Sequence, residues 1–110
     1  MPIANLRKIS MKHEVTVKNK LKKYIPQFMD NAQKDIHLLT QAALDKNIPV
    51  MERISHSIKG YGKPFGFDTL GDLSAQINAA IKAGNIDDAI SMIHDLDDYF
   101  SKIVIVYGND

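Results

Sequence analysis

A histidine near the middle of the chain, His56, lies among residue types that could present a nucleophile to another molecule. The apolar residues around it recur every three or four positions and predict one buried face of a helix: Met51, Ile54, Ile58 and Tyr61. At roughly 100° per residue, His56 points away from that face, together with Lys59, Gly60 and Lys63. The sequence therefore predicts an exposed imidazole beside two ammonium groups and a residue that has no side chain.

Histidine is partly neutral and nucleophilic near pH 7. A phosphoryl group on an imidazole nitrogen forms a labile phosphoramidate, which can pass to a carboxylate that approaches in line. Lys59 and Lys63 would supply positive charge for the phosphoryl oxygens, and Gly60 would let another protein close over the ring. The pattern favours a phosphoryl acceptor at His56, and we expect this chain to need neither a metal nor a cofactor of its own.

Residues 56–60, which read H-S-I-K-G, resemble the H-x-x-K-G motif of the histidine-containing phosphotransfer (HPt) domains of bacterial two-component phosphorelays. Residues 65–70 are similar to the family's turn into its third bundle helix, and residues 21–31 to its first-helix region. The resemblance covers about residues 15–107, nearly the whole chain. It implies a four-helix bundle that carries phosphate between kinases and the aspartates of receiver domains.

By this resemblance, His56 is the phosphorylated residue, Lys59 neutralises the phosphoryl group and Gly60 makes room for the receiver domain. Asn78 corresponds to a polar residue, often Gln, on the family's third helix, and is expected to help hold the phosphate. Lys63 replaces one of the family's small residues and adds charge to the same site.

A partly exposed Phe65 near His56 would suit a receiver-docking surface. Tyr61 and Pro64 depart from the family pattern, in which small residues follow the glycine. The expected partners are the receiver domain of a response regulator, a hybrid sensor histidine kinase, or both. The expected role is that of a phosphorylated relay intermediate, not of an enzyme.

Four segments have the apolar period of amphipathic helices. The first is predicted over residues 21–46, with Pro26 near its start, or with a short helical turn before a kink at Pro26. The second begins near Pro49 and ends between Gly62 and Gly66. Residues 60–66 contain three glycines and one proline, so this stretch cannot stay helical throughout.

Asp68 is the predicted N-cap of the third helix, and Asn85 or Asp87 that of the fourth. We extend the fourth helix through the β-branched residues 103–106 to Tyr107, because no second strand offers itself as a partner. The predicted fold is all-α, an antiparallel up-and-down four-helix bundle with a short N-terminal arm or extra helical turn. We divide the chain into an arm of residues 1–15 and a bundle domain of residues 16–110.

The arm and the start of the first helix are basic, since they carry Lys8, Lys12, Lys18, Lys20, Lys22 and Lys23. Residues 13–17 alternate between polar and apolar types and would suit a short extended arm. No aromatic residue lies among these lysines until Tyr24, so the stacking needed to bind single-stranded nucleic acid is lacking. A solvated leader is therefore favoured over a nucleic-acid-binding tail.

The composition is that of one globular domain of 110 residues, with a net charge of +1 and no cysteine. No apolar run is long enough to span a bilayer, and the first residues lack a signal-peptide pattern. We therefore expect a cytoplasmic protein without membrane or nucleic-acid partners. The four predicted helices can bury their apolar faces against one another within one chain, which favours a monomer.

Two alternatives to a receiver-linked relay remain open from the sequence. The domain could be the direct substrate of a chemotaxis-type kinase, or a helical adaptor that uses the same face without phosphorylation. An enzyme is disfavoured, because the sequence has no nucleophile–base pair, metal cluster or phosphate-binding loop.

Overall fold

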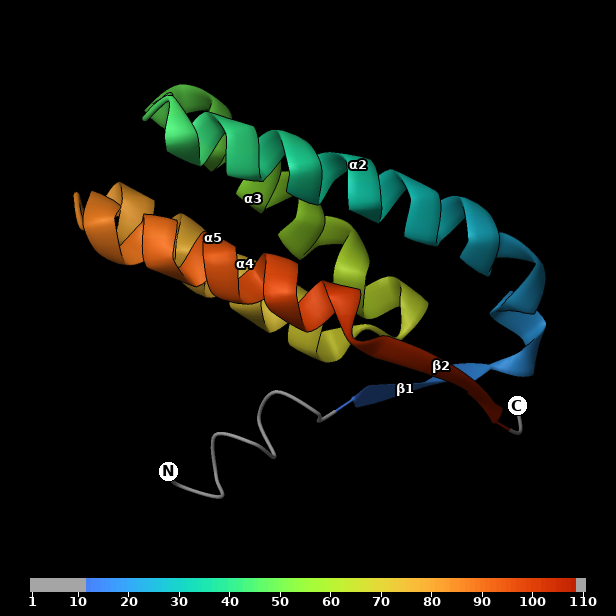
Figure 1. Ribbon diagram of the computed structural model, residues 1–110. Coiled ribbons are helices and arrows are strands. Elements are labelled where there is room, and N and C mark those ends of the chain that lie inside the picture. The colour runs from blue at the N-terminus through green and yellow to red at the C-terminus, as the bar shows by residue number, and fades with distance from the viewer. Residues whose placement is uncertain (1–11, 109–110) are drawn as a thin grey trace, which may run out of the picture.

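The computed structural model describes residues 12–108, which form a helical bundle with a two-stranded sheet at one end (Figure 1). Its elements in chain order are β1 (His13–Lys18), the 3-10 helix η1 (Asn19–Tyr24), α2 (Ile25–Leu44), α3 (Ile48–Gly62), the 3-10 helix η2 (Lys63–Phe65), α4 (Asp68–Lys82), α5 (Ile86–Ser101) and β2 (Ile103–Gly108). The four α-helices close a ring, since α2 contacts α3 and α5, and α4 contacts α3 and α5. The predicted four-helix bundle is confirmed to the extent that the described residues are mostly helical and form four α-helices.

The first two α-helices begin where proline and asparagine favour a helix start. Pro26 lies in the first turn of α2, where a missing N–H costs little, and the residues before it form the 3-10 helix η1. The predicted helix over residues 21–46 is therefore two elements with a change of geometry near Pro26. Asn47 caps α3 by accepting a hydrogen bond from the backbone N–H of Val50 at 3.4 Å.

The ends of α3 and α4 follow the turn residues, with one correction. Helix α3 ends at Gly62, within the predicted interval, and Gly66 turns the chain with a φ of 91° that suits glycine. Asp68 is the first residue of α4, and its N-cap is Phe67, so the predicted cap is displaced by one residue. Asn85 is the N-cap of α5 as predicted, without a side-chain hydrogen bond.

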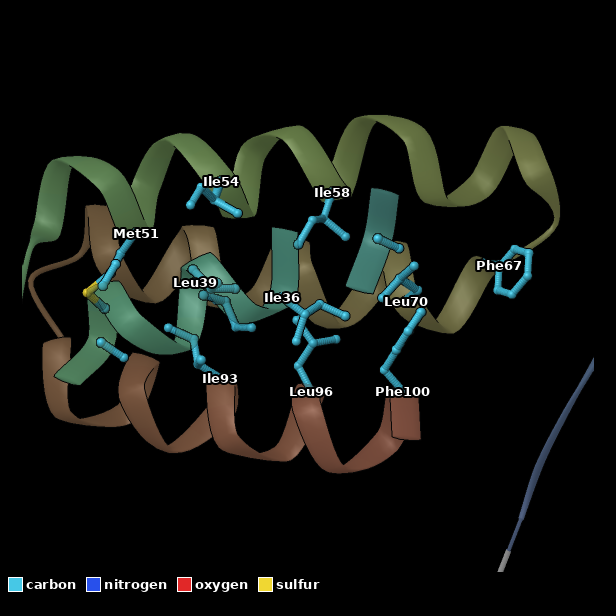
Figure 2. Close-up of a cluster of buried hydrophobic side chains, with 14 of the residues drawn as sticks. Ile36, Leu39, Met51, Ile54, Ile58, Phe67, Leu70, Ile93, Leu96 and Phe100 are labelled. Atoms are coloured by element: carbon cyan, nitrogen blue, oxygen red, sulfur yellow. The ribbon is translucent and has the colours of Figure 1, made fainter. Parts of the chain in front are cut away.

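The core lies between the four helices and uses the apolar stripes (Figure 2). Figure 2 shows side chains from all four helices meeting there, and each of the following is buried: Ile36 and Leu39 from α2, Met51 and Ile58 from α3, Leu70 from α4, Ile93 and Leu96 from α5. Burial of this apolar surface supplies the main driving force for folding. Within residues 12–108, no helix is both long and apolar enough to cross a membrane.

The two strands correct the all-α prediction. Strand β2 pairs in parallel with β1, with Val15 opposite Ile105 and Val17 opposite Tyr107 (Figure 1). Val15 and Val17 are buried, and the neighbouring Glu14, Thr16 and Lys18 are exposed, as strand alternation requires. The predicted extension of the fourth helix to Tyr107 is wrong, because α5 ends at Ser101 and residues 103–108 gain a backbone partner in β1.

Strand β1 also crosses the boundary drawn between a 1–15 arm and a 16–110 domain. Residues 13–15 of that arm therefore take part in the sheet, while residues 1–11 lie outside the described residues.

Candidate functional site

His56 lies on the outer face of α3 and is exposed, whereas Ile54 and Ile58 on either side of it are buried. The helical period therefore presents the imidazole to solvent, as the sequence predicts. The ring is reached from outside without any movement of the core. This accessibility is what a group needs to react with the active site of another protein.

A shallow pocket of about 330 Å³ surrounds His56 between α3 and α4. Its lining residues are Pro49, Glu52, Arg53, His56, Asn78 and Lys82. Two cations that the sequence analysis missed, Arg53 and Lys82, thus lie around the imidazole. Arg53 could have been found, because it precedes His56 by three positions on the same helix. Lys82 follows Asn78 by four positions on α4, so only the placement of α4 against α3 brings it to the pocket.

Asn78 is only 3% exposed, and its amide is tied to α3. Its Nδ2 donates to the backbone carbonyl oxygen of Glu52 and to Ser55 Oγ, each at 3.1 Å. Ser55 Oγ in turn donates to the Glu52 carbonyl at 3.1 Å. This network joins α4 to the turn of α3 that carries His56, so Asn78 helps to fix the position of that turn.

Lys59 and Gly60 share the exposed side of α3 with His56. A Cβ built on Gly60 would meet no heavy atom of residues 12–108 within 4 Å. Packing within the bundle therefore does not require glycine at this position. The space beside Gly60 is therefore open. Lys59 follows His56 by three positions on the same exposed side of α3, although neither Lys59 nor Gly60 lines the His56 pocket.

Lys63 lies in η2, beyond the end of α3, and its ammonium group pairs with Asp72 Oδ1 at 3.0 Å. The hydrogen bond from Lys63 to Asp72 and the charge of that carboxylate raise the pKa of Lys63. Its side chain lines a second pocket, with Lys18 and Lys20, and is not among the residues that line the His56 pocket. The structure therefore does not bring Lys63 into that pocket with Asn78.

Phe65 is half-buried, with its ring centroid 4.8 Å from that of Phe28. It lines an open groove of about 550 Å³ over α2 and α3, together with Tyr24, Leu38 and Tyr61. Phe65 also lines the pocket of Lys18, Lys20 and Lys63, and neither surface includes the His56 pocket. No group of three or more His, Cys, Asp or Glu residues within residues 12–108 has the geometry of a metal site.

The comparisons with known proteins found a family and no individual relative. No curated protein and no solved structure matches the chain. Residues 23–104 match the family model of the Hpt domain, which covers most of the chain, including α3 and the His56 pocket. Hpt domains carry phosphoryl groups in two-component phosphorelays, are not classical enzymes, and interact with receiver domains of response regulators. This chain belongs to the Hpt domain family.

Proposed function

We propose that His56 accepts a phosphoryl group from the aspartate of a receiver domain, or from a kinase, and passes it to a response regulator. The observation that carries the proposal is the exposed imidazole of His56 on the outer face of α3, within the H-S-I-K-G motif of an Hpt domain. The neighbouring surface supports it, because Lys59 is exposed beside the ring and Gly60 leaves space for a docked protein.

The transfer is a nucleophilic displacement at phosphorus. A neutral imidazole nitrogen of His56 attacks the phosphorus of an aspartyl phosphate, a P–N bond forms, and the P–O bond to the aspartate breaks. The aspartate leaves as a carboxylate, and the imidazole carries the phosphoryl group. The second transfer reverses these bonds with the carboxylate of the next protein as nucleophile.

The surrounding residues have separate proposed roles in this displacement. Lys59 stabilises the charge on the phosphoryl oxygens, with Arg53 and Lys82 as further cations at the rim of the pocket. Asn78 acts through the turn of α3, because its amide hydrogens are directed to Glu52 and Ser55. Gly60 has no side chain that would obstruct a docked protein, so the partner's reacting aspartate can approach in line.

Phosphorylation of the chain by the small phosphodonor phosphoramidate tests the acceptor directly. The wild-type protein should gain one phosphoryl group in its mass spectrum, and the label should be lost in acid. The variant His56→Gln should stay unlabelled with an unchanged circular dichroism spectrum. The matched control is His94→Gln, since His94 is exposed on α5 and should leave labelling intact. An acid-labile label retained in His56→Gln would refute the assignment.

Incubation of the labelled protein with purified receiver domains then separates the open alternatives. Loss of the label to a receiver supports the relay. Labelling by an ATP-bound kinase, with no transfer from any phosphorylated receiver, supports a direct kinase substrate. A chain that no donor labels would instead be a helical adaptor.

A further inference from the structure

The open groove over α2 and α3 combines aromatic side chains with one carboxylate. Its lining residues are Tyr24, Gln27, Phe28, Asn31, Lys34, Asp35, Leu38, Tyr61 and Phe65. Four of them are aromatic, and the volume of about 550 Å³ is that of a site for a small ligand. We call this hollow the aromatic groove.

The aromatic rings of the groove are built on Phe28. The ring of Phe28 lies edge-on to that of Tyr61, with centroids 5.6 Å apart, and its centroid lies 4.8 Å from that of Phe65. Phe28 is buried and holds these two half-buried rings in place. Tyr24 and Leu38 add exposed apolar surface, since they are 50% and 52% exposed. An occupant of the groove would therefore meet ordered rings and remove apolar surface from water.

Asp35 brings a negative charge into these apolar surroundings. Its Oδ2 accepts a hydrogen bond from the Tyr61 hydroxyl at 2.8 Å, and the residue is half-buried. No ion pair among residues 12–108 includes Asp35. The hydrogen bond orients the carboxylate but brings no positive charge to it, so the described part of the chain supplies Asp35 with no cationic partner.

Two lysines near the groove are engaged with other groups. Lys34 lines the groove, but its ammonium group pairs with Asp30 at 3.4 Å, and Asp30 is not a lining residue. The ammonium group of Lys23, which is not a lining residue either, lies 5.2 Å from the ring centroid of Tyr24. The Tyr24 ring thus already attracts a cation, whereas the carboxylate of Asp35 has none.

The charge of Asp35 decides which class of ligand can fill the groove. A neutral apolar ligand would remove water from the carboxylate and supply no countercharge, which costs free energy. An anion would meet a like charge as well. An organic cation with apolar substituents neutralises the carboxylate and places its own charge against aromatic rings, an arrangement that proteins use to bind quaternary ammonium groups.

We propose that the aromatic groove binds a small organic cation, of the class of alkylammonium compounds. Asp35 supplies the countercharge, the Tyr61 hydroxyl holds that carboxylate in place, and the ring of Tyr24 contributes aromatic surface. The site goes beyond the proposed function, because the groove shares no lining residue with the His56 pocket and needs no phosphate chemistry.

NMR titration of the full chain with three probes of matched shape tests the site. The probes are choline, the neutral dimethylbutanol in which carbon replaces the ammonium nitrogen, and the corresponding anion dimethylbutyrate. Choline should bind about fivefold more tightly than dimethylbutanol, and dimethylbutyrate should bind most weakly. The amide signals of residues 24–38 and 61–65 should shift, while those of residues 78–82 stay unchanged.

Two variants assign the binding to the carboxylate and to the ring. Asp35→Asn removes the charge but keeps an oxygen that can accept the Tyr61 hydrogen bond, so choline and dimethylbutanol should then bind with nearly equal affinity. The matched control is Asp97→Asn, because Asp97 is exposed on α5 and does not line the groove. Tyr24→Leu keeps apolar bulk without an aromatic ring, and should weaken choline more than dimethylbutanol.

Three results would overturn the proposal. The first is equal binding of choline and dimethylbutanol by the wild type, and the second is a preference for choline that persists in Asp35→Asn. The third is a set of choline shifts spread over acidic residues of the whole surface. A groove that a purified receiver domain covers, and that does not distinguish choline from dimethylbutanol, would be a protein-docking face instead.

Discussion

Gly62 of α3 and Gly71 of α4 meet with their backbones in direct contact. A Cβ on Gly62 would lie 2.9 Å from the backbone nitrogen of Gly71 and 3.1 Å from its Cα. Both glycines are buried, and the backbone there cannot yield as a flexible side chain could. This close approach fixes how α4 lies against α3, and therefore which α4 side chains reach His56.

Replacement of Gly62 by alanine should destabilise the fold. The added methyl group overlaps the backbone of α4, and overpacking of this kind costs about 1–3 kcal/mol in the free energy of unfolding. Urea denaturation followed by circular dichroism measures it. Gly60→Ala is the matched control two residues away, and should gain up to about 1 kcal/mol because alanine favours a helix. Equal stability of the two variants would show that the contact tolerates a methyl group.

A large side chain at Gly60 should block partner docking without harming the fold. Gly60→Phe places a ring on the open surface beside His56, where a Cβ meets no described atom within 4 Å. We expect wild-type labelling by phosphoramidate and transfer to a receiver reduced by roughly 100-fold, because the reacting groups are displaced. Quenched time courses on the same protein preparation give the rate of labelling by phosphoramidate and the rate of transfer to the receiver. Undiminished transfer would mean that the receiver does not cover Gly60.

Removal of the Lys59 charge should change phosphate transfer and the lifetime of the phosphohistidine less than Gly60→Phe changes transfer. Lys59 is exposed, and exposed charge pairs contribute ~0.2–1 kcal/mol. We therefore expect Lys59→Ala to slow transfer, or to shorten the phosphohistidine lifetime, by at most about fivefold. The decay of the acid-labile label gives the lifetime, and circular dichroism should show unchanged helicity. Lys34→Ala on α2 is the control. If rate and lifetime both match the wild type, Lys59 does not stabilise the phosphoryl group.

The hydrogen bond between Asn78 and Ser55 should be visible in stability measurements. Asn78→Ala leaves the Ser55 hydroxyl and the Glu52 carbonyl without the amide donor, at a cost of about 1–3 kcal/mol in the free energy of unfolding. A double-mutant cycle with Ser55→Ala measures the coupling: the cost of Asn78→Ala should shrink when Ser55 is already absent. Strict additivity would contradict an energetic link between these two residues.

Tyr61 should make the fold sensitive to alkaline pH. Its hydroxyl donates to Asp35 Oδ2 at 2.8 Å, and burial, followed by this hydrogen bond and the charge of Asp35, raises the pKa of Tyr61. The neutral phenol is therefore favoured in the folded state. Its contribution is complete below the unfolded pKa of about 10 and falls as pH rises above that value.

The variant Tyr61→Phe tests this dependence. At pH 7 it should be less stable than the wild type by about 1 kcal/mol, the usual contribution of such a hydrogen bond. Above pH 10 the difference between the two proteins should narrow, because only the wild type can lose the Tyr61 proton. Urea midpoints measured across this range give the comparison. A difference that stays constant with pH would exclude the Tyr61–Asp35 pair as its source.

The sequence by itself determined the four helices and the exposure of His56. Apolar residues three or four positions apart define which face of a helix is buried, and this period is local, so Met51, Ile54 and Ile58 place His56 on the opposite face. Two helix boundaries were also readable, because Gly62 and Asn85 act within one turn of the chain, whereas the predicted end of the fourth helix was wrong. The H-S-I-K-G motif needed no tertiary information.

Only the tertiary structure decided which distant segments meet. Residues 103–106 are apolar at every position, so their pattern does not distinguish a strand from a helix. They form a strand because they pair with β1. Contact between α3 and α4 likewise brings Asn78 and Lys82 to His56 and places Lys63 beside Asp72. A local pattern says which way a side chain points, whereas its partner depends on the path of the whole chain.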